Sequence, residues 1–377
     1  MPINRRHFLK VISASLISSS LISCTHKKFF NPDEDILISG GQLEDENNAQ
    51  NVLTIVNLTQ QEKRLIEIPF LAHGMVIDPN DKQRIFCFEK NAGNACTIDL
   101  QTQSVSATFS SETNQLFSGH ACFSQDGKQL ICIESNSDNY QGSIAIRDRE
   151  TFELIHQLPT LGLSPHDCQL TKDNILTISN TGRSESGFHQ PSLVSINLNT
   201  EKLVERIKLD KQNLNCGHFN ISKNNDLVIA SAPIDSSNKS LSGGVSLRRQ
   251  DGMLTTMTEP ELVIKRMTGE ALGIEVHQQQ QIAAITHPQA NLLTFWSIKD
   301  QKIIKAFGIE KPRGISQTLD KKHFIVSYGE KPAMAKISST ELEPQADSIV
   351  QPTLASGEHL INWSKSLREI MPTRVYD

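Results

Sequence analysis

The sequence predicts an all-β protein, a seven-bladed β-propeller. Three observations predict it: an internal repeat with the period of propeller blades, two strands in every copy of the repeat, and unassigned strands at both ends of the chain. The composition agrees with this fold. Of 377 residues, 37% are hydrophobic and only 5% aromatic, while Asn, Gln and Ser are frequent. Such a composition is typical of many short strands joined by polar loops.

The repeat has four copies that begin with a histidine and continue as a strand, a polar turn and a second strand. These copies read LAHGMVIDPNDKQRIFCFEK, SGHACFSQDGKQLICIES, SPHDCQLTKDNILTISNT and CGHFNISKNNDLVIASAP. Two more copies, ALGIEVHQQQQIAAITHP and PRGISQTLDKKHFIVSYG, carry glycine in place of the histidine. The anchor positions lie 41 to 55 residues apart, at His73, His120, His166, His218, Gly273 and Gly314. This period indicates blades of four antiparallel strands.

The two ends of the chain supply the seventh blade. Residues 36–41, 52–58 and 64–69 read as three strands before the first anchor, and HLINW at 359–363 lies where a seventh anchor is due. We expect this C-terminal segment to be the inner strand of the blade that the N-terminal strands begin, because such closure leaves no open sheet edge. A six-bladed ring with one added strand is the competing prediction. Residues 35–377 are thus predicted to form a single domain.

The N-terminus resembles an export signal. Arg5 and Arg6 followed by HFLK look like the twin-arginine (Tat) motif, and the apolar run at 11–23 is shorter than the roughly 20 residues that a membrane-spanning helix needs. LISC, which ends at Cys24, resembles a lipobox in which the cysteine is acylated. We therefore expect residues 1–24 to be a Tat signal with a lipobox, residues 25–34 a tether, and the mature protein a periplasmic lipoprotein. The alternative is an ordinary Tat signal cleaved nearby.

Charge and motifs exclude several classes of function. The chain has 37 Lys and Arg against 42 Asp and Glu, a net charge of −5, and no stripe of basic residues. Nucleic acid is therefore not expected as a partner. The sequence also has no Ser-His-Asp order, no glycine-rich phosphate loop and no HExxH motif, so hydrolases of the familiar types and nucleotide-binding proteins lack support.

The four anchor histidines are the main candidate site. Because each begins an inner strand, we expect His73, His120, His166 and His218 to line one arc of the channel mouth. Converging imidazoles suit a transition metal such as iron or copper, a haem, or an anion. The alternative is that duplication copied a histidine that only bonds the backbone of the neighbouring blade. The spacing matches no zinc motif.

Other polar residues are expected on the same face of the ring. Asp167 follows His166, and Glu134 and Asn180 lie at the loops of two blades. His287 lies at the corresponding loop of the fifth repeat, and Arg313 is expected across the channel from the histidines. These residues are candidates for holding a ligand.

The cysteines allow more than one interpretation. Cys87 and Cys96 flank one predicted hairpin turn, and Cys122 and Cys132 flank another, so each pair is expected to be directly opposed. Either strained disulfides or buried free thiols fit this placement. The two cysteines that lie two residues from an anchor histidine are alternative thiolate ligands: Cys168 and Cys216.

The chain is similar over about residues 35–370 to a group of Tat-exported periplasmic propellers, domain of unknown function 1513, related to the YVTN-type quinoprotein amine dehydrogenase-like propellers. FSGHACFSQDGKQLICIESNSDNYQGSIAIRD, LGLSPHDCQLTKDNILTISN and CGHFNIS carry the resemblance. His73, His120, His166 and His218 coincide with the histidines of the family. Members usually end in a WDNHL-like motif, but this chain has NWSKSL at 362–367. If the family site uses that terminal histidine, we expect it to be altered here.

The resemblance implies a role in iron handling, because members are often encoded beside periplasmic imelysin-like iron-uptake proteins and di-haem oxidoreductases. The first hypothesis is a monomeric, non-enzymatic accessory protein, anchored by lipid, whose histidine face holds a metal, a haem or a loop of a periplasmic protein partner. The second is a metal-dependent oxidoreductase or lactonase-like hydrolase that uses the same channel. The third is a protein-interaction scaffold without a ligand.

Overall fold

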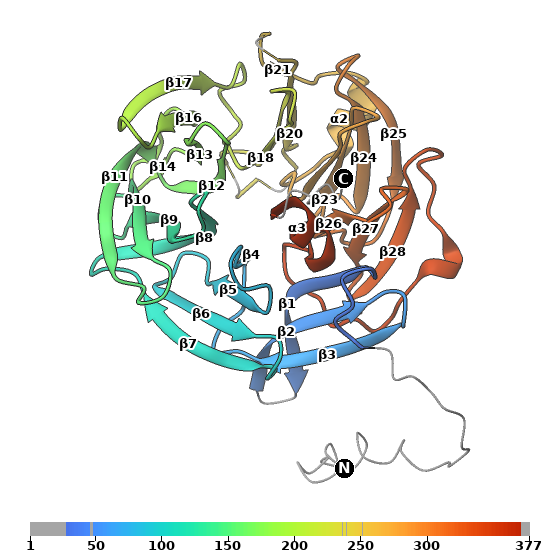
Figure 1. The fold of residues 1–377 in the computed structure, drawn as a ribbon. Helices are drawn as coiled ribbons and strands as arrows, with labels where there is room; N and C mark the ends of the chain where they lie inside the picture. The colour runs from blue at the N-terminus through green and yellow to red at the C-terminus, as the bar shows by residue number, and fades with distance from the viewer. Residues whose placement is uncertain (1–27, 46–47, 236, 239, 251, 371–377) are drawn as a thin grey trace, which may run out of the picture.

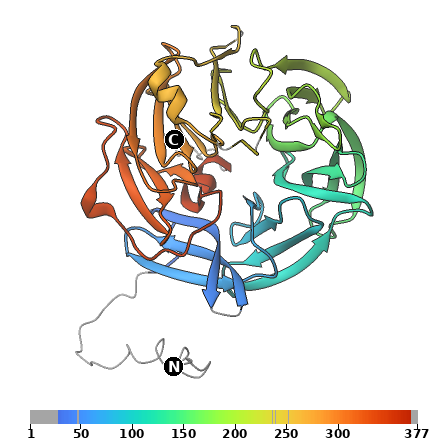
Figure 2. The ribbon, with the colours of Figure 1, turned by 180° about the vertical axis from the view of Figure 1, so that it is seen from behind.

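A closed ring of seven blades surrounds a central channel (Figure 1). The computed structural model describes residues 28–45, 48–235, 237–238, 240–250 and 252–370. Each blade is an antiparallel sheet with one edge strand facing the channel and the opposite edge at the rim, as the view from behind also shows (Figure 2). The predicted seven-bladed propeller is confirmed, and the six-bladed alternative is wrong.

Blade 1 joins the two ends of the chain. Its strand order is β29-β1-β2-β3, with β1 (Ile36–Asp45), β2 (Asn48–Asn57), β3 (Glu62–Glu67) and β29 (Ile361–Asn362). The inner strand β29 pairs with β1 through Leu37 opposite Asn362 and Ile38 opposite Ile361. The predicted closure by the C-terminal segment is therefore confirmed.

Blades 2, 3 and 4 carry three of the anchor histidines on or directly before their inner strands. Blade 2 contains β4 (Gly74–Ile77), β5 (Arg84–Phe88), β6 (Asn94–Asp99) and β7 (Ser104–Ser110). Blade 3 contains β8 (Gln115–Phe123), β9 (Gln129–Asn136), β10 (Gln141–Asp148) and β11 (Leu154–Leu163). Blade 4 contains β12 (Pro165–Leu170), β13 (Ile175–Asn180), β16 (Ser192–Asn197) and β17 (Lys202–Lys208), and the small hairpin of β14 (Arg183–Ser184) and β15 (Gly187–Phe188) extends from it.

Blades 5, 6 and 7 complete the ring. Blade 5 contains β18 (His218–Ile221), β19 (Leu227–Ser231), β20 (Gly244–Arg248) and β21 (Thr255–Thr256), and the short helix α2 (Glu261–Arg266) follows it. Blade 6 contains β22 (Ile274–His277), β23 (Ile282–His287), β24 (Leu292–Ser297) and β25 (Lys302–Gly308). Blade 7 has three strands, β26 (Ile315–Gln317), β27 (His323–Tyr328) and β28 (Ala333–Ser338). Single bridges from β28 to Pro344 and Val350, around the 3₁₀-helix η1 (Ala346–Ser348), take the place of its fourth strand.

Apolar side chains between neighbouring blades hold the ring together. In the interface of blades 2 and 3, the rings of Phe88 and Phe117 meet edge to face at 5.4 Å, and both side chains are buried. The interface of blades 3 and 4 is aliphatic, with Ile131, Ile178 and Val194 in one cluster. Middle strands such as β5, β13 and β23 are buried on both faces, so their sequences are nearly continuous apolar runs rather than strict alternations.

Residues 28–34, which the sequence assigned to a tether, pack against the propeller. Phe29 and Phe30 are buried against blade 1, and the ring of Phe30 meets that of Trp363 at 5.8 Å. Two adjacent phenylalanines bury enough apolar area to keep this segment on the domain. Arg5, Arg6 and Cys24 lie outside the described residues, so the predicted export signal and lipidation site stay predictions.

The helix α3 (Trp363–Ile370) follows the closing strand and lies beside the channel (Figure 1). Lys365 Nζ of this helix bonds Glu275 Oε1 of β22 at 2.7 Å, and Trp363 Nε1 donates to the carbonyl of Lys82 at 2.9 Å. These contacts tie the C-terminal segment to blades 2 and 6. Within the described residues no helix has the length and apolar character needed to cross a membrane.

Truncation of Trp363 tests the importance of this closure. The side chain is 2% exposed and fills the space between Phe30 and blade 2. We expect Trp363→Ala to lower the free energy of unfolding by about 3–5 kcal/mol, because it leaves a cavity and an unpaired carbonyl. Urea unfolding followed by circular dichroism measures the loss. Leu262→Ala, at a side chain 81% exposed, is the control and should leave stability unchanged; equal stability of both variants would contradict the closing role.

Candidate metal centre

Five histidines gather at one end of the central channel. His73 directly precedes β4, His120 lies in β8, His166 in β12, and His218 begins β18. The fifth, His359, lies two residues before β29. Successive inner strands contact one another around the channel, so histidines at equivalent positions of the repeat meet although they are far apart in sequence.

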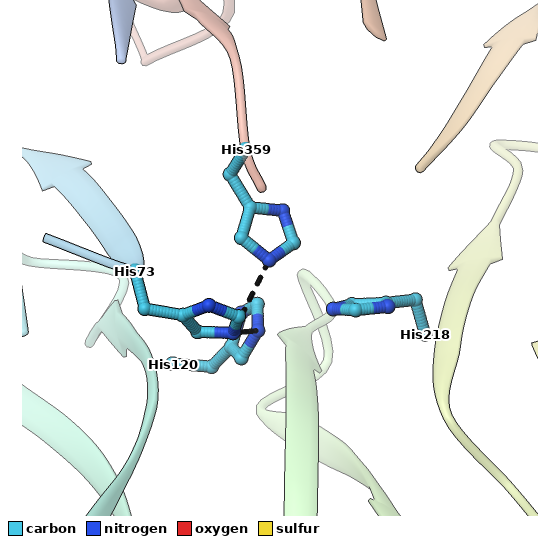
Figure 3. A group of neighbouring side chains, drawn as sticks. All are labelled: His73, His120, His218 and His359. Atoms are coloured by element: carbon cyan, nitrogen blue, oxygen red, sulfur yellow. Dashed lines mark hydrogen bonds between the residues drawn. The ribbon is translucent and has the colours of Figure 1, made fainter. Parts of the chain in front are cut away.

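Four of these imidazoles converge. His73, His120, His218 and His359 each offer one ring nitrogen, and these nitrogens all lie within 4.8 Å of one another. The Nε2 atom of His73 lies 3.2 Å from Nε2 of His120 and 3.3 Å from Nε2 of His359. Figure 3 shows the four rings pointing inward from separate strands and loops. We call these four residues the histidine ring.

Gly119 makes room for the imidazole of His73 at the point where blades 2 and 3 meet. Its φ of +101° is a backbone conformation that residues with a side chain rarely adopt. A Cβ atom at this position would lie 2.3 Å from Cδ2 of His73. The Gly-His pair in SGHACF therefore allows the inner strand of blade 3 to pass directly beneath the imidazole of His73.

Two carboxylates contact Nδ1 atoms of the histidine ring, which point away from its centre. Glu358 Oε2 lies 3.0 Å from Nδ1 of His73 and 2.9 Å from Nζ of Lys90. Asp167 Oδ1 lies 3.4 Å from Nδ1 of His120, and Oδ2 of the same side chain accepts the backbone N–H of Phe219 at 3.3 Å. A carboxylate at Nδ1 fixes the orientation of an imidazole and directs its Nε2 toward the centre.

Burial keeps these imidazoles uncharged. Desolvation lowers the pKa of His73, His120 and His218 well below the ordinary value, and the neighbouring histidines lower it further. Desolvation also lowers the pKa of His359 to about 4. For Asp167, burial raises the pKa to about 7, against the opposing effect of two backbone N–H donors. At neutral pH the ring nitrogens therefore have lone pairs available for a cation.

His166 lies next to the histidine ring rather than in it. Its Nε2 is 3.0 Å from Nε2 of His218, and the two ring centroids are 4.4 Å apart. The carbonyl of His166 also accepts the hydroxyl of Ser118 at 3.0 Å. The sequence placed His166 among four equivalent histidines, whereas the structure puts it in contact with the group through His218.

His359 is the member of the ring that the sequence argument missed. It lies in HLINW, the segment assigned to the seventh anchor, so its place in the repeat was the available signal. An imidazole from the C-terminal segment joins the ring, whereas the expectation that the terminal histidine of the family is altered at NWSKSL stays a prediction.

Three other candidates have structural contacts elsewhere. Glu134 is fully buried and bonds Nη2 of Arg147 at 2.8 Å. Asn180 accepts the hydroxyl of Thr160 at 2.7 Å. Arg313 donates to the carbonyl of Ser356 at 3.0 Å and so holds the C-terminal segment. The predicted face thus holds polar residues that support blades and loops as well as those that contact the imidazoles.

The cysteines follow the strand register. Cys87 and Cys96 are directly opposed, as predicted. Cys122 is opposite Ile131, and Cys132 is opposite Ala121, so the prediction that Cys122 and Cys132 are opposed is wrong. The reason is the turn, which pairs Ser124 with Gln129 and offsets the two cysteines by one residue. The six cysteines in the described part of the chain are free thiols.

Comparison with known proteins identifies the family. A family model described as "Protein of unknown function (DUF1513)" matches residues 66–362, which include all five histidines. The chain belongs to this family. No curated protein sequence matches the chain.

Solved structures similar to this DUF1513 protein share its fold at low sequence identity. Hydrazine synthase of Kuenenia stuttgartiensis is 11% identical with a TM-score of 0.61, over 85% of this chain and 99% of that one. A hypothetical selenium-binding protein from Sulfolobus tokodaii is 12% identical with a TM-score of 0.62, over 89% and 92%. Dihydro-heme d1 dehydrogenase NirN, in complex with DHE, is 13% identical with a TM-score of 0.58, over 89% and 77%. These likenesses establish a propeller fold.

His287, a further polar residue expected on this face, is buried in blade 6. Its Nε2 lies 2.9 Å from Oγ1 of Thr294, and desolvation lowers its pKa to about 3. Between pH 3 and its ordinary pKa of 6.5 the unfolded chain binds a proton that the folded chain does not, so acid favours unfolding through this residue.

The variant His287→Gln tests this effect. Urea unfolding at pH 7 and pH 5 should show that wild type loses about 2 kcal/mol more of its free energy of unfolding than the variant does on acidification. The exposed His156, paired with Glu201 at 3.0 Å, offers the control variant His156→Gln. Parallel pH dependence in wild type and His287→Gln would contradict a buried neutral imidazole.

Proposed function

We propose that this DUF1513 protein is a metal-binding propeller whose histidine ring holds one divalent transition-metal ion of the first row. The convergence of four ring nitrogens within 4.8 Å is the observation that carries the proposal. A tetrahedral ion with metal–nitrogen bonds of about 2.05 Å separates its ligand nitrogens by about 3.3 Å. The Nε2 separations of 3.2 and 3.3 Å around His73 are close to this spacing.

The donor set narrows the choice of metal. Imidazole nitrogens suit zinc, copper, iron and nickel, whereas magnesium and calcium prefer oxygen. Four neutral imidazoles do not offset the charge of the ion, and the carboxylates of Glu358 and Asp167 at the Nδ1 atoms provide that compensation. Iron is the member of this set that fits the role in iron handling implied by the family resemblance.

The same geometry favours a metal ion without a porphyrin over haem. It also favours a site with a complete set of protein ligands over a hydrolytic site that keeps a coordination position open. A porphyrin supplies four nitrogens of its own, and four imidazoles so close together leave no space for its plane. Catalytic zinc sites keep one position open, whereas four imidazole ligands complete a tetrahedral shell. We therefore propose that the protein holds or passes on the ion rather than hydrolysing a substrate.

We further propose that the protein acts after export, as a monomeric lipoprotein of the periplasm that serves a protein partner of an iron-acquisition or redox system. The Arg5-Arg6 motif and the LISC segment ending at Cys24 support export and anchoring. Long polar loops on the face of the histidine ring offer a surface for the partner.

Substitution of single histidines tests the metal site. In the full-length protein, purified without added chelator, we expect one ion per chain by inductively coupled plasma mass spectrometry. Loss of a residue that only contacts a metal ligand typically weakens metal binding by about 10- to 100-fold, and we expect this range for His166→Gln. His359→Gln removes a ligand and should weaken metal binding by more than about 100-fold.

The control for these variants is His156→Gln, which changes an exposed histidine on the rim strand β11 and should leave metal content unchanged. Circular dichroism confirms that each variant is folded. Full metal content in folded His359→Gln, or none in wild type refolded with each candidate ion, would overturn the proposed function.

The predicted lipid anchor has its own test. Cys24→Ser removes the thiol that acylation requires, so we expect the exported protein to move from the membrane fraction to the soluble periplasmic fraction. Cell fractionation with immunoblotting measures the distribution. Cys216→Ser, at a buried cysteine of blade 5, is the control and should stay with membranes. Identical fractionation of Cys24→Ser and wild type would contradict lipidation.

A further inference from the structure

Three sulfur-containing side chains follow three of the channel histidines at the same interval. Met75 stands two residues after His73, and Cys122 stands two residues after His120. Cys168 likewise follows His166 by two residues. Two residues of extended strand advance the chain by about 7 Å and return the side chain to the same side. Bulges at His120 and at His166 interrupt this alternation, so Met75 packs in the apolar cluster of blades 1 and 2, whereas Cys122 and Cys168 pack against the cluster of blades 3 and 4.

The two thiols meet across the boundary between blades 3 and 4. Cys122 lies on β8 and Cys168 on β12, which are neighbouring inner strands. The Cys168 thiol is within hydrogen-bonding reach of the Cys122 thiol. Both side chains are half-buried and pack at the edge of the aliphatic cluster between the blades. Within their own sheets Cys122 is paired with Ile131 and Cys168 with Ile178, so the contact between the two cysteines is a tertiary one.

All three sulfur side chains line one cavity of about 520 Å³. Its wall continues to Ser124 and Gln125 on one side and to Thr171 and Lys172 on the other. These residues belong to the turns after the inner strands β8 and β12, so the cavity reaches toward the turn face, opposite the loops near the histidine ring. The C-terminal segment also lines this cavity, through Ile361, Ser366 and Glu369.

We propose that Cys122 and Cys168 form a second metal site that binds Cu(I). Thiolate and thioether sulfurs select soft cations. Zinc in proteins takes four ligands almost without exception, whereas two thiolates are enough for Cu(I), which accepts linear coordination by two sulfur atoms. On binding, the metal replaces the two thiol protons, which leave to solvent, and no electron transfer is involved.

Cys87 and Cys96 provide the contrast. These thiols are also in mutual contact, but both side chains are completely buried in blade 2 and do not line the cavity. A soft ion reaching the cavity meets only Cys122 and Cys168 as a thiol pair. The second site thus depends on access from the cavity as well as on the proximity of two sulfurs.

Competition for Cu(I) tests the proposal. The reduced full-length protein, handled without oxygen, is titrated against the Cu(I) complex of bathocuproine disulfonate, and copper transfer is read from the loss of the chelator's colour. Wild type should take up Cu(I), and X-ray absorption should show sulfur neighbours. Cys122→Ser with Cys168→Ser should abolish this uptake, whereas the matched pair Cys87→Ser with Cys96→Ser should retain it.

A further variant separates this site from the histidine ring. His73→Gln with His359→Gln should lose the divalent ion and keep sulfur-bound Cu(I), whereas the Cys122 and Cys168 double variant should keep the divalent ion. Equal Cu(I) uptake by wild type and that cysteine variant overturns the second site. The second site is also overturned if the isolated protein contains a Cys122–Cys168 disulfide and reduction of that disulfide produces no Cu(I) binding. Circular dichroism confirms that all variants are folded.

Discussion

The pairing of β29 with β1 is the interaction on which the rest of this propeller depends. Without it, β1 would present an unpaired edge, and blade 1 would lack its inner strand. The same segment is held by Arg313 at Ser356, by the N–H of Gly357 bonded to the carbonyl of Gly40, and by the hydroxyl of Ser39 bonded to the carbonyl of His359. Ring closure therefore also sets the position of His359.

Closure and the candidate metal centre are thus coupled. The C-terminal segment brings both His359, a member of the histidine ring, and Glu358, which contacts His73. A chain that failed to close would retain three imidazoles on separate blades and lose the carboxylate at Nδ1 of His73. The stability of the propeller and the geometry of the histidine ring therefore depend on the same few hydrogen bonds.

Burial determines the electrostatic character of the channel. Crowded imidazoles lose the solvation of a charged form and repel one another's protons, so they remain neutral bases. The carboxylates beside them compensate a bound cation, although Glu358 is shared with Lys90. The thiols of Cys122 and Cys168 meet a different environment, the edge of an aliphatic core, and offer softer donors. Nitrogen and sulfur donors thereby lie in separate environments.

From the residues alone, the repeat predicted the number of blades, the closure by the two ends of the chain and four histidines at one end of the channel. It did so because a repeat with strand periodicity places equivalent residues at equivalent points of a ring. Which imidazoles converge became visible in the folded chain, where His359 joins the histidine ring and His166 lies beside it. The tertiary structure also assigned Glu134 to Arg147, and it brought Cys122 to Cys168 instead of Cys132. Such contacts depend on strand register, side-chain direction and the approach of neighbouring blades. The spacing of residues along the chain does not specify any of these.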